Sequence, residues 1–202
     1  MAHKKPENVP GLIRNEDGLL LESVAEAVQA GQCIIEIGPF TGKSTCFMAR
    51  GAKRAGSVDD DIHIYSIDPW ELLDSPISGT GLTIARTREE AHELFRENVK
   101  KCGFSEIVTE FHGFGRDAAA RWNSPQPIGM VYVDGNHKYL AVKQDIADWA
   151  PKLEVGGYMV FDDYNSPQVR RAVDELAKAG GFTFEQDFMG STDRFAVLEK
   201  SA

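Results

Sequence analysis

The sequence lacks any long apolar stretch. Charged and polar residues interrupt the hydrophobic ones throughout, so no segment approaches the roughly 20 apolar residues of a membrane-spanning helix. Residues 1–10 are polar and lack the apolar core of a secretion signal. We therefore expect a chain that has no membrane partner.

Cysteine and positive charge are both scarce. The three cysteines, Cys33, Cys46 and Cys102, are an odd number without the spacing of a metal site. Two of them fall in segments that we expect to be buried, so reduced thiols and a cytoplasmic location are predicted. With 22 basic against 31 acidic residues, the formal net charge of -9 provides no basic surface for a nucleic-acid partner. The acidic excess favours solubility, although acidic patches can also hold a metal ion.

The length of 202 residues suits one domain, long enough to bury about two-thirds of its unfolded surface. Residues 1–16 contain Pro6, Pro10 and Gly11 without apolar periodicity, and we expect a flexible N-terminal arm there. Residues 17–202 are expected to form a single domain. The sequence leaves a homo-oligomer open.

Short apolar runs alternate with amphipathic stretches along this domain. The predicted strands are residues 33–37, 62–67, 107–111, 128–133 and 158–161. The helix after the fourth strand is expected to bury Leu153 and to end at the glycines 156–157. Residues 71–88 have no clear period and are a candidate lid.

This alternation predicts an α/β fold with a doubly wound, mostly parallel sheet. Residues 182–188 and 194–198 are expected to add a C-terminal antiparallel hairpin at its edge, which gives seven strands. The carboxyl ends of the parallel strands should open onto one crevice.

The first predicted strand runs through a glycine turn into a helix. Gly38 and Gly42 allow a sharp turn and the close approach of a ligand. The polar run after Gly42 begins a helix whose free amide groups favour negative charge. Glu36 is a carboxylate at the end of a buried strand, so it needs donors and either a structural reason or a cationic ligand.

Two glycine patterns that bind phosphates are absent from this turn. The phosphate loop G-x-x-x-x-G-K-[ST] requires glycine where Ile37 stands. The dinucleotide pattern G-x-G-x-x-G requires glycine where Phe40 stands. A P-loop-like nucleotide hydrolase, with Lys43 on phosphates and Asp134 or Asp162 on magnesium, is an alternative that the missing glycine opposes.

Acidic residues follow several predicted strands. Asp68 ends the second strand, where a carboxylate can accept hydrogen bonds from both ribose hydroxyls, although it can equally begin a turn before Pro69. Asp134 follows the fourth strand, and Asp162 and Asp163 follow the fifth, so these three should converge. Their mutual repulsion would keep at least one protonated unless a divalent cation such as Mg²⁺ balances them. Alternatively, each acid caps a turn or a helix start.

The stretch 36–44, E-x-G-x-x-x-G-x-S, resembles the first motif of class I S-adenosylmethionine-dependent methyltransferases. With Asp68, the turn 113–117, Asp134 and the pair 162–163, the chain resembles the catechol-type and caffeoyl-coenzyme A-type metal-dependent O-methyltransferases. It is most similar to the macrocin-type sugar O-methyltransferases of methyltransferase family 24. The resemblance covers residues 36–173, and residues 134–139 are its most specific part.

The resemblance implies S-adenosylmethionine as the cofactor and Mg²⁺ or another divalent cation as a second one. The cofactor-binding residues that it implies are Glu36, Gly38, Phe40, Thr41, Gly42, Ser44, Asp68, Gly113, Phe114, Gly115 and Asp134. Ser44 would hold the methionine carboxylate, and Phe114 or Gly115 would flank the adenine. The implied metal ligands are Asp134, Asp162 and Asp163.

The implied catalytic residues are His137 and Asp134. His137 lies three residues after Asp134, where the catechol enzymes have a basic lysine, and would act as the general base. We expect O-methylation of a small hydroxylated acceptor, such as a sugar, a catechol or a natural-product-like molecule. A metal-free methyltransferase and a cofactor-binding relative without catalysis are the remaining alternatives.

Overall fold

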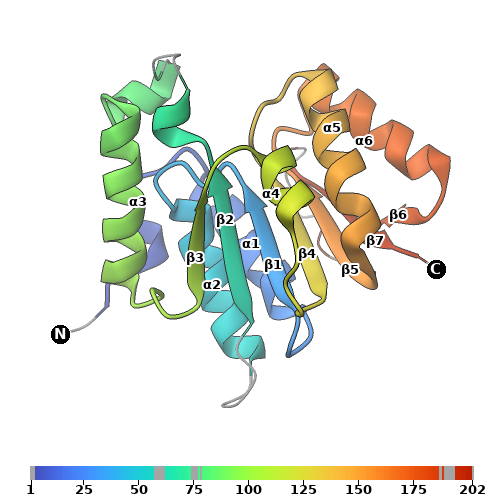
Figure 1. Ribbon diagram of the computed structural model, residues 1–202, viewed down its shortest axis with the longest axis horizontal. Coiled ribbons are helices and arrows are strands. Elements are labelled where there is room, and N and C mark those ends of the chain that lie inside the picture. Colours follow the sequence, from blue (N-terminus) through green and yellow to red (C-terminus); the bar gives the residue numbers. More distant parts are fainter. Residues whose placement is uncertain are drawn as a thin grey trace.

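A seven-stranded sheet forms the centre of the fold, in a computed structural model that describes residues 3–56, 62–73, 77, 79–186, 188 and 194–201 (Figure 1). The strands are β1 (Cys33–Ile37), β2 (His63–Asp68), β3 (Val108–His112), β4 (Ile128–Val133), β5 (Leu153–Phe161), β6 (Phe182–Phe184) and β7 (Ala196–Lys200). Their order is β3-β2-β1-β4-β5-β7-β6. The first five are parallel, and β7 is antiparallel to both β5 and β6. The predicted doubly wound sheet with its antiparallel hairpin is confirmed.

Helices cover both faces of this sheet (Figure 1). The helices are α1 (Asn15–Glu26), α2 (Lys43–Ala55), α3 (Arg88–Cys102), α4 (Gly115–Arg121), α5 (Tyr139–Trp149) and α6 (Pro167–Ala179). Short 3₁₀ helices are η1 (Pro6–Asn8), η2 (Trp70–Leu72), η3 (Gly79–Thr83) and η4 (Ala150–Lys152). Ile34 of β1 packs toward α1 and α2, whereas its neighbour Ile35 packs toward α5 and α6. Successive residues thus bury on opposite faces, which is why β1 is apolar apart from Glu36.

The predicted flexible arm, residues 1–16, is packed against the domain where the structure describes it. Val9 and Ile13 are buried in the clusters that involve α2 and α3. The Lys4 amide donates to the Lys101 carbonyl at 2.8 Å, and Glu7 forms an ion pair with Arg50. Two well-placed apolar residues anchor this segment, and they give no periodicity that a sequence pattern can detect.

The predicted helix through Leu153 is wrong. Helix α5 ends at Trp149, Pro151 lies in η4, and Leu153 already begins β5. Leu153 pairs with Ile128 whereas Tyr158 pairs with Met130, so the intervening residues of β5 bulge out. Leu153 is buried as expected, but from a strand.

Of the candidate lid, residues 74–76 and 78 lie outside the described residues, and the rest contains η2 and η3.

All three cysteines are free and buried. Among the helices that the structure describes, none has the length and apolar character to cross a membrane.

Candidate active site

A cavity of about 1100 Å³ opens at the carboxyl ends of the parallel strands. The predicted site residues that line it are Gly38, Phe40, Thr41, Ser44, Asp68, Phe114, Gly115, Asp134, His137, Asp162 and Asp163. Those that do not line it are Glu36, Gly42 and Gly113. The topology therefore gathers most of the predicted residues around one space, although they come from distant parts of the sequence.

Gly38 brings the tips of β1 and β4 into contact. Its φ is +89°, and a Cβ atom added there would lie 2.3 Å from the Asp134 carbonyl oxygen. Gly42, with φ +83°, sets the start of α2, and its amide donates to the Pro39 carbonyl at 2.8 Å. Gly42 does not reach the cavity, but its left-handed backbone turns α2 toward it.

Glu36 lies beneath the turn and not in the cavity. Its fully buried carboxylate accepts hydrogen bonds from Ser44 Oγ at 2.5 Å, Thr45 Oγ1 at 2.6 Å and Ser66 Oγ at 2.7 Å. Burial raises the pKa of Glu36, and the three hydroxyls oppose that rise. Glu36 therefore has a structural role, because its hydrogen bonds tie α2 and β2 to β1. It does not line the cavity in which a cofactor contact was predicted for it.

Asp68 lies at the cavity edge with its carboxylate partly engaged. Its Oδ1 accepts from the Trp70 amide at 2.7 Å, and its Oδ2 accepts from the Phe40 amide at 3.4 Å. Burial raises its pKa. The two predicted alternatives are thus compatible, because Asp68 orders the turn and still faces the cavity. Gly113 contacts the backbone of Asp68, since its amide donates to the Asp68 carbonyl at 2.9 Å.

Asp134 and Asp162 converge as the sequence predicts. One ligand atom each from Asp134, His137 and Asp162 lies within 4.8 Å of the others. Burial and the nearby Asp162 carboxylate raise the pKa of Asp134 well above its usual range. Tyr132 Oη also donates to Asp134 Oδ2 at 3.0 Å.

Arg194 is a site residue whose ion pair with Asp162 was not predicted from the sequence. Its Nε and Nη2 donate to the two oxygens of Asp162, each at 2.7 Å. Burial would raise the pKa of Asp162, but Arg194 outweighs burial and holds that pKa below its usual value. The signal that could have indicated this contact is the position of Arg194 in the chain. It shortly precedes β7, whose Ala196 pairs with Phe161 at the end of β5, directly before Asp162.

His137 is held at both ring nitrogens on the cavity wall. Its Nδ1 lies 2.8 Å from Asp163 Oδ2, and its Nε2 lies 3.3 Å from Asp134 Oδ1. The hydrogen bond with Asp134 raises the pKa of His137, against the opposing effect of burial. Asp163 adopts a φ of +50°, unusual for a non-glycine residue, and so turns its carboxylate toward the imidazole.

The donor set differs from the predicted trio of acids. The clustered ligand atoms belong to Asp134, His137 and Asp162, whereas Asp163 pairs with His137. Magnesium prefers oxygen ligands in octahedral geometry, and both oxygens of Asp162 already accept from Arg194. As arranged, these residues do not fit a magnesium ion. Arg194 balances the charge of Asp162, and the raised pKa of Asp134 favours its protonated form, so these acids have less negative charge than the sequence analysis assigned to a metal site.

Residues 35–164 match the methyltransferase domain of methyltransferase family 24. The chain belongs to this family. The resemblance to methyltransferase family 24 drawn from the sequence is therefore confirmed.

A curated relative of this family 24 methyltransferase is an uncharacterized protein of Acanthamoeba polyphaga mimivirus, 39% identical over 162 residues. The match covers 78% of this chain and 65% of the relative, so the chain spans less than two thirds of that protein's length.

Solved structures resemble the methyltransferase over almost its whole length. The O-methyltransferase TomG from Streptomyces achromogenes, in complex with SAM, has a TM-score of 0.66 at 21% identity and covers 95% of this chain and 82% of its own. An O-methyltransferase from Bacillus cereus, in complex with SAH, has a TM-score of 0.65 at 16% identity, covering 96% and 85%. At these identities the likeness shows a shared fold.

Proposed function

We propose that this methyltransferase moves the methyl group of S-adenosylmethionine to a hydroxyl oxygen of a small acceptor. The observation that carries the proposal is His137, held between Asp134 and Asp163 on the wall of the large cavity. The neighbours TomG and the Bacillus cereus enzyme, described as O-methyltransferases with SAM or SAH, support it. A cavity of about 1100 Å³ leaves room for the cofactor and an acceptor.

The cavity walls fit the parts of S-adenosylmethionine. The Gly38 turn allows backbone contact where a side chain would collide with β4. The start of α2, with Ser44 and Lys43 lining the cavity, suits the methionine carboxylate. Asp68 suits the ribose hydroxyls, and Phe114 offers an aromatic face for the adenine. When bound, the cofactor supplies a methyl group on a positively charged sulfur.

In the proposed mechanism, neutral His137 accepts the proton of the acceptor hydroxyl through Nε2, whose contact with Asp134 at 3.3 Å is the longer of its two. Asp163 and Asp134 orient the imidazole, and their carboxylates stabilise the imidazolium that forms. General base catalysis of this kind contributes about 10²–10⁴-fold. Alignment of the oxygen with the methyl group contributes up to roughly 7–11 kcal/mol in favourable cases.

The mechanism has no step through a metal. Arg194 already donates to both oxygens of Asp162, so a divalent cation that used Asp134 and Asp162 would compete with this ion pair. The divalent-metal assistance expected from the sequence stays a prediction, and activity after treatment with a strong chelator tests it.

Calorimetry with S-adenosylmethionine and with ATP tests the proposal first. We expect binding of the former, and ATP binding alone would favour the hydrolase. Turnover is then followed as release of S-adenosylhomocysteine with simple catechols and hexoses as acceptors. His137→Gln should lower kcat about 10²–10⁴-fold and leave cofactor affinity unchanged. Full turnover in this variant would contradict the assigned base.

A further inference from the structure

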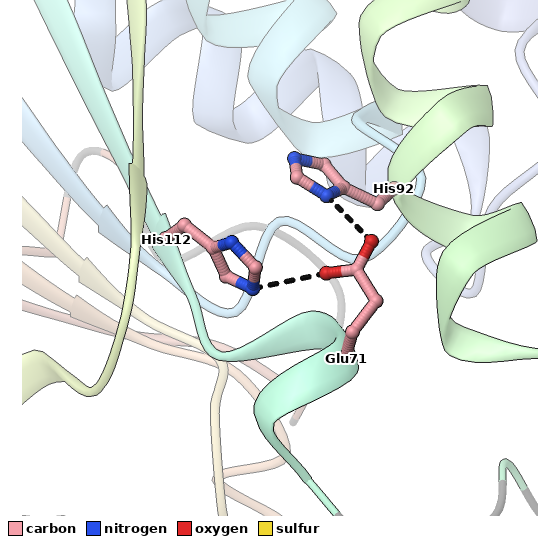
Figure 2. Close-up of side chains that lie close together, drawn as sticks. All are labelled: Glu71, His92 and His112. Atoms are coloured by element: carbon pink, nitrogen blue, oxygen red, sulfur yellow. Dashed lines mark hydrogen bonds and ion pairs between the residues drawn. The ribbon is translucent and has the colours of Figure 1, made fainter.

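Three metal-ligating side chains meet outside the cavity. Glu71 projects from η2, His92 from α3 and His112 from the end of β3 (Figure 2). None of them lines the cavity described above. Figure 2 shows the Glu71 carboxylate placed between the two imidazole rings, with one oxygen directed to each.

The spacing of the ligand atoms is that of a small cation site. Glu71 Oε1 lies 2.9 Å from His92 Nδ1, and Glu71 Oε2 lies 2.9 Å from His112 Nε2. All three residues offer ligand atoms within 4.8 Å of one another. Tetrahedral zinc with bonds of about 2.0–2.1 Å places its ligands roughly 3.3 Å apart. Small side-chain rotations therefore suffice to admit the ion.

The surroundings of His92 fix the position of its ring. Its Nε2 lies 3.0 Å from Glu110 Oε2, and Arg96 holds the same carboxylate, with Nε 2.9 Å from Oε1. The ring also stacks on Trp70, with centroids 4.1 Å apart and planes 8° apart. Metal-binding histidines commonly donate their second nitrogen to a carboxylate in this way.

Both ring nitrogens of His92 face a carboxylate oxygen, so a neutral ring directs one lone pair at a carboxylate. With the proton on Nε2 toward Glu110, that lone pair is on Nδ1 and faces Glu71. The contact is attractive only if a cation is present, either a second proton on the ring or a metal ion. Glu71 Oε2 is a buried acceptor that receives no hydrogen bond, and its ion-pair contact is His112 Nε2 at 2.9 Å. His112 Nε2 also lies 3.1 Å from the Pro69 carbonyl, so metal binding requires its proton on Nδ1.

We propose that Glu71, His92 and His112 bind a zinc ion. Two imidazoles and a carboxylate are a borderline-soft donor set that suits zinc better than magnesium or calcium. His92 is buried whereas His112 is 39% exposed at its side chain, so water completes the coordination from the outer side. The ion links η2, α3 and β3 and acts as a structural clamp, independently of whether the chain transfers methyl groups.

Titration of metal-free protein with ZnCl₂, followed by calorimetry and thermal unfolding, tests the site. We expect one equivalent that raises Tm, and a tetrahedral d–d spectrum when cobalt replaces zinc. Glu71→Gln and His112→Gln should each weaken this equivalent at least about 100-fold. Glu110→Gln keeps all three ligands and should weaken it about 10–100-fold.

His63→Gln is the matched control, because it removes a histidine from the opposite end of β2. Unchanged zinc affinity in Glu71→Gln and His112→Gln would overturn the proposal, as would an equal loss in His63→Gln. Zinc lost in His137→Gln but retained in Glu71→Gln would assign the ion to the Asp134 cluster and also overturn it. Failure of the wild-type protein to bind zinc would show a proton-linked ion-pair cluster instead. Glu71→Gln is nearly isosteric, and the cobalt spectrum of the wild-type protein needs no variant.

Discussion

Gly38 is the residue at which the geometry of the site is most tightly constrained. We expect Gly38→Ala to destabilise the protein by about 2–5 kcal/mol, since it adds a clash with the Asp134 carbonyl to the left-handed strain. Gly31→Ala is the control, because Gly31 has a similar φ of +82° with nothing within 4 Å of an added Cβ. It should cost only about 1–2 kcal/mol. Urea unfolding measures both, and equal losses would refute the close contact.

Glu36 gives a second prediction at this scale. Glu36→Gln should lower the free energy of unfolding by about 1–3 kcal/mol, because three hydroxyls lose a charged acceptor in a fully buried position. The exposed Glu26→Gln on α1 should change stability by less than about 0.5 kcal/mol. Loss of cofactor binding with unchanged stability in Glu36→Gln would instead support a direct contact.

The sequence predicts acids at strand ends better than it predicts their partners. Asp134 and Asp162 could be placed together because both end neighbouring parallel strands, where position follows from topology. Arg194 could not, because its contact depends on β7 inserting beside β5, a long-range pairing that leaves no local pattern. The same holds for Glu36, whose three donors come from α2 and β2.

Among the elements, fully buried strands are the most predictable. The bounds of β1 and β4 agree with the apolar runs at 33–37 and 128–133, since each is covered on both faces. Element ends fail where tertiary packing decides, as at Leu153, which is apolar in a helix or a strand alike. The expectation of a flexible arm at residues 1–16 misses the packing of residues 3–14 for a similar reason, because isolated contacts hold this segment in place.

Helix α5 carries a carboxyl whose titration should be measurable. Burial, with a smaller effect of Asp148, raises the pKa of Asp145 from 3.8 to about 7. Between these values the folded state binds more protons than the unfolded chain, so stability falls as pH rises through this window. Asp145→Asn should therefore flatten the profile and stabilise the protein by about 1–3 kcal/mol at pH 8.

Denaturant unfolding from pH 4 to pH 8 measures this effect. Asp117→Asn, in which an exposed carboxyl of α4 is neutralised, is the control and should leave the profile unchanged. A profile of Asp145→Asn parallel to that of the wild-type protein would contradict the assignment.

At the scale of the whole molecule, Arg194 connects the C-terminal hairpin to the acids of the central strands. Arg194→Gln leaves the buried Asp162 without its cation and should destabilise the fold by about 3–5 kcal/mol. It also frees both oxygens of Asp162 beside Asp134. Added MgCl₂ should therefore raise Tm of the variant more than that of the wild-type protein.

Equal magnesium responses in the two proteins would show that Arg194 does not compete with a metal. Arg171→Gln, which removes an exposed guanidinium from α6, provides the control for loss of one positive charge.

The placement of β7 between β5 and β6 also fixes an order of events during translation. β6 is synthesised before the strand on which it docks, so the outer edge of β5 stays open until residues 196–200 have left the ribosome. Arg194 emerges with them, and until then Asp162 has no guanidinium beside it. The nascent protein thus closes its sheet edge and places Arg194 at the cavity in the same late step.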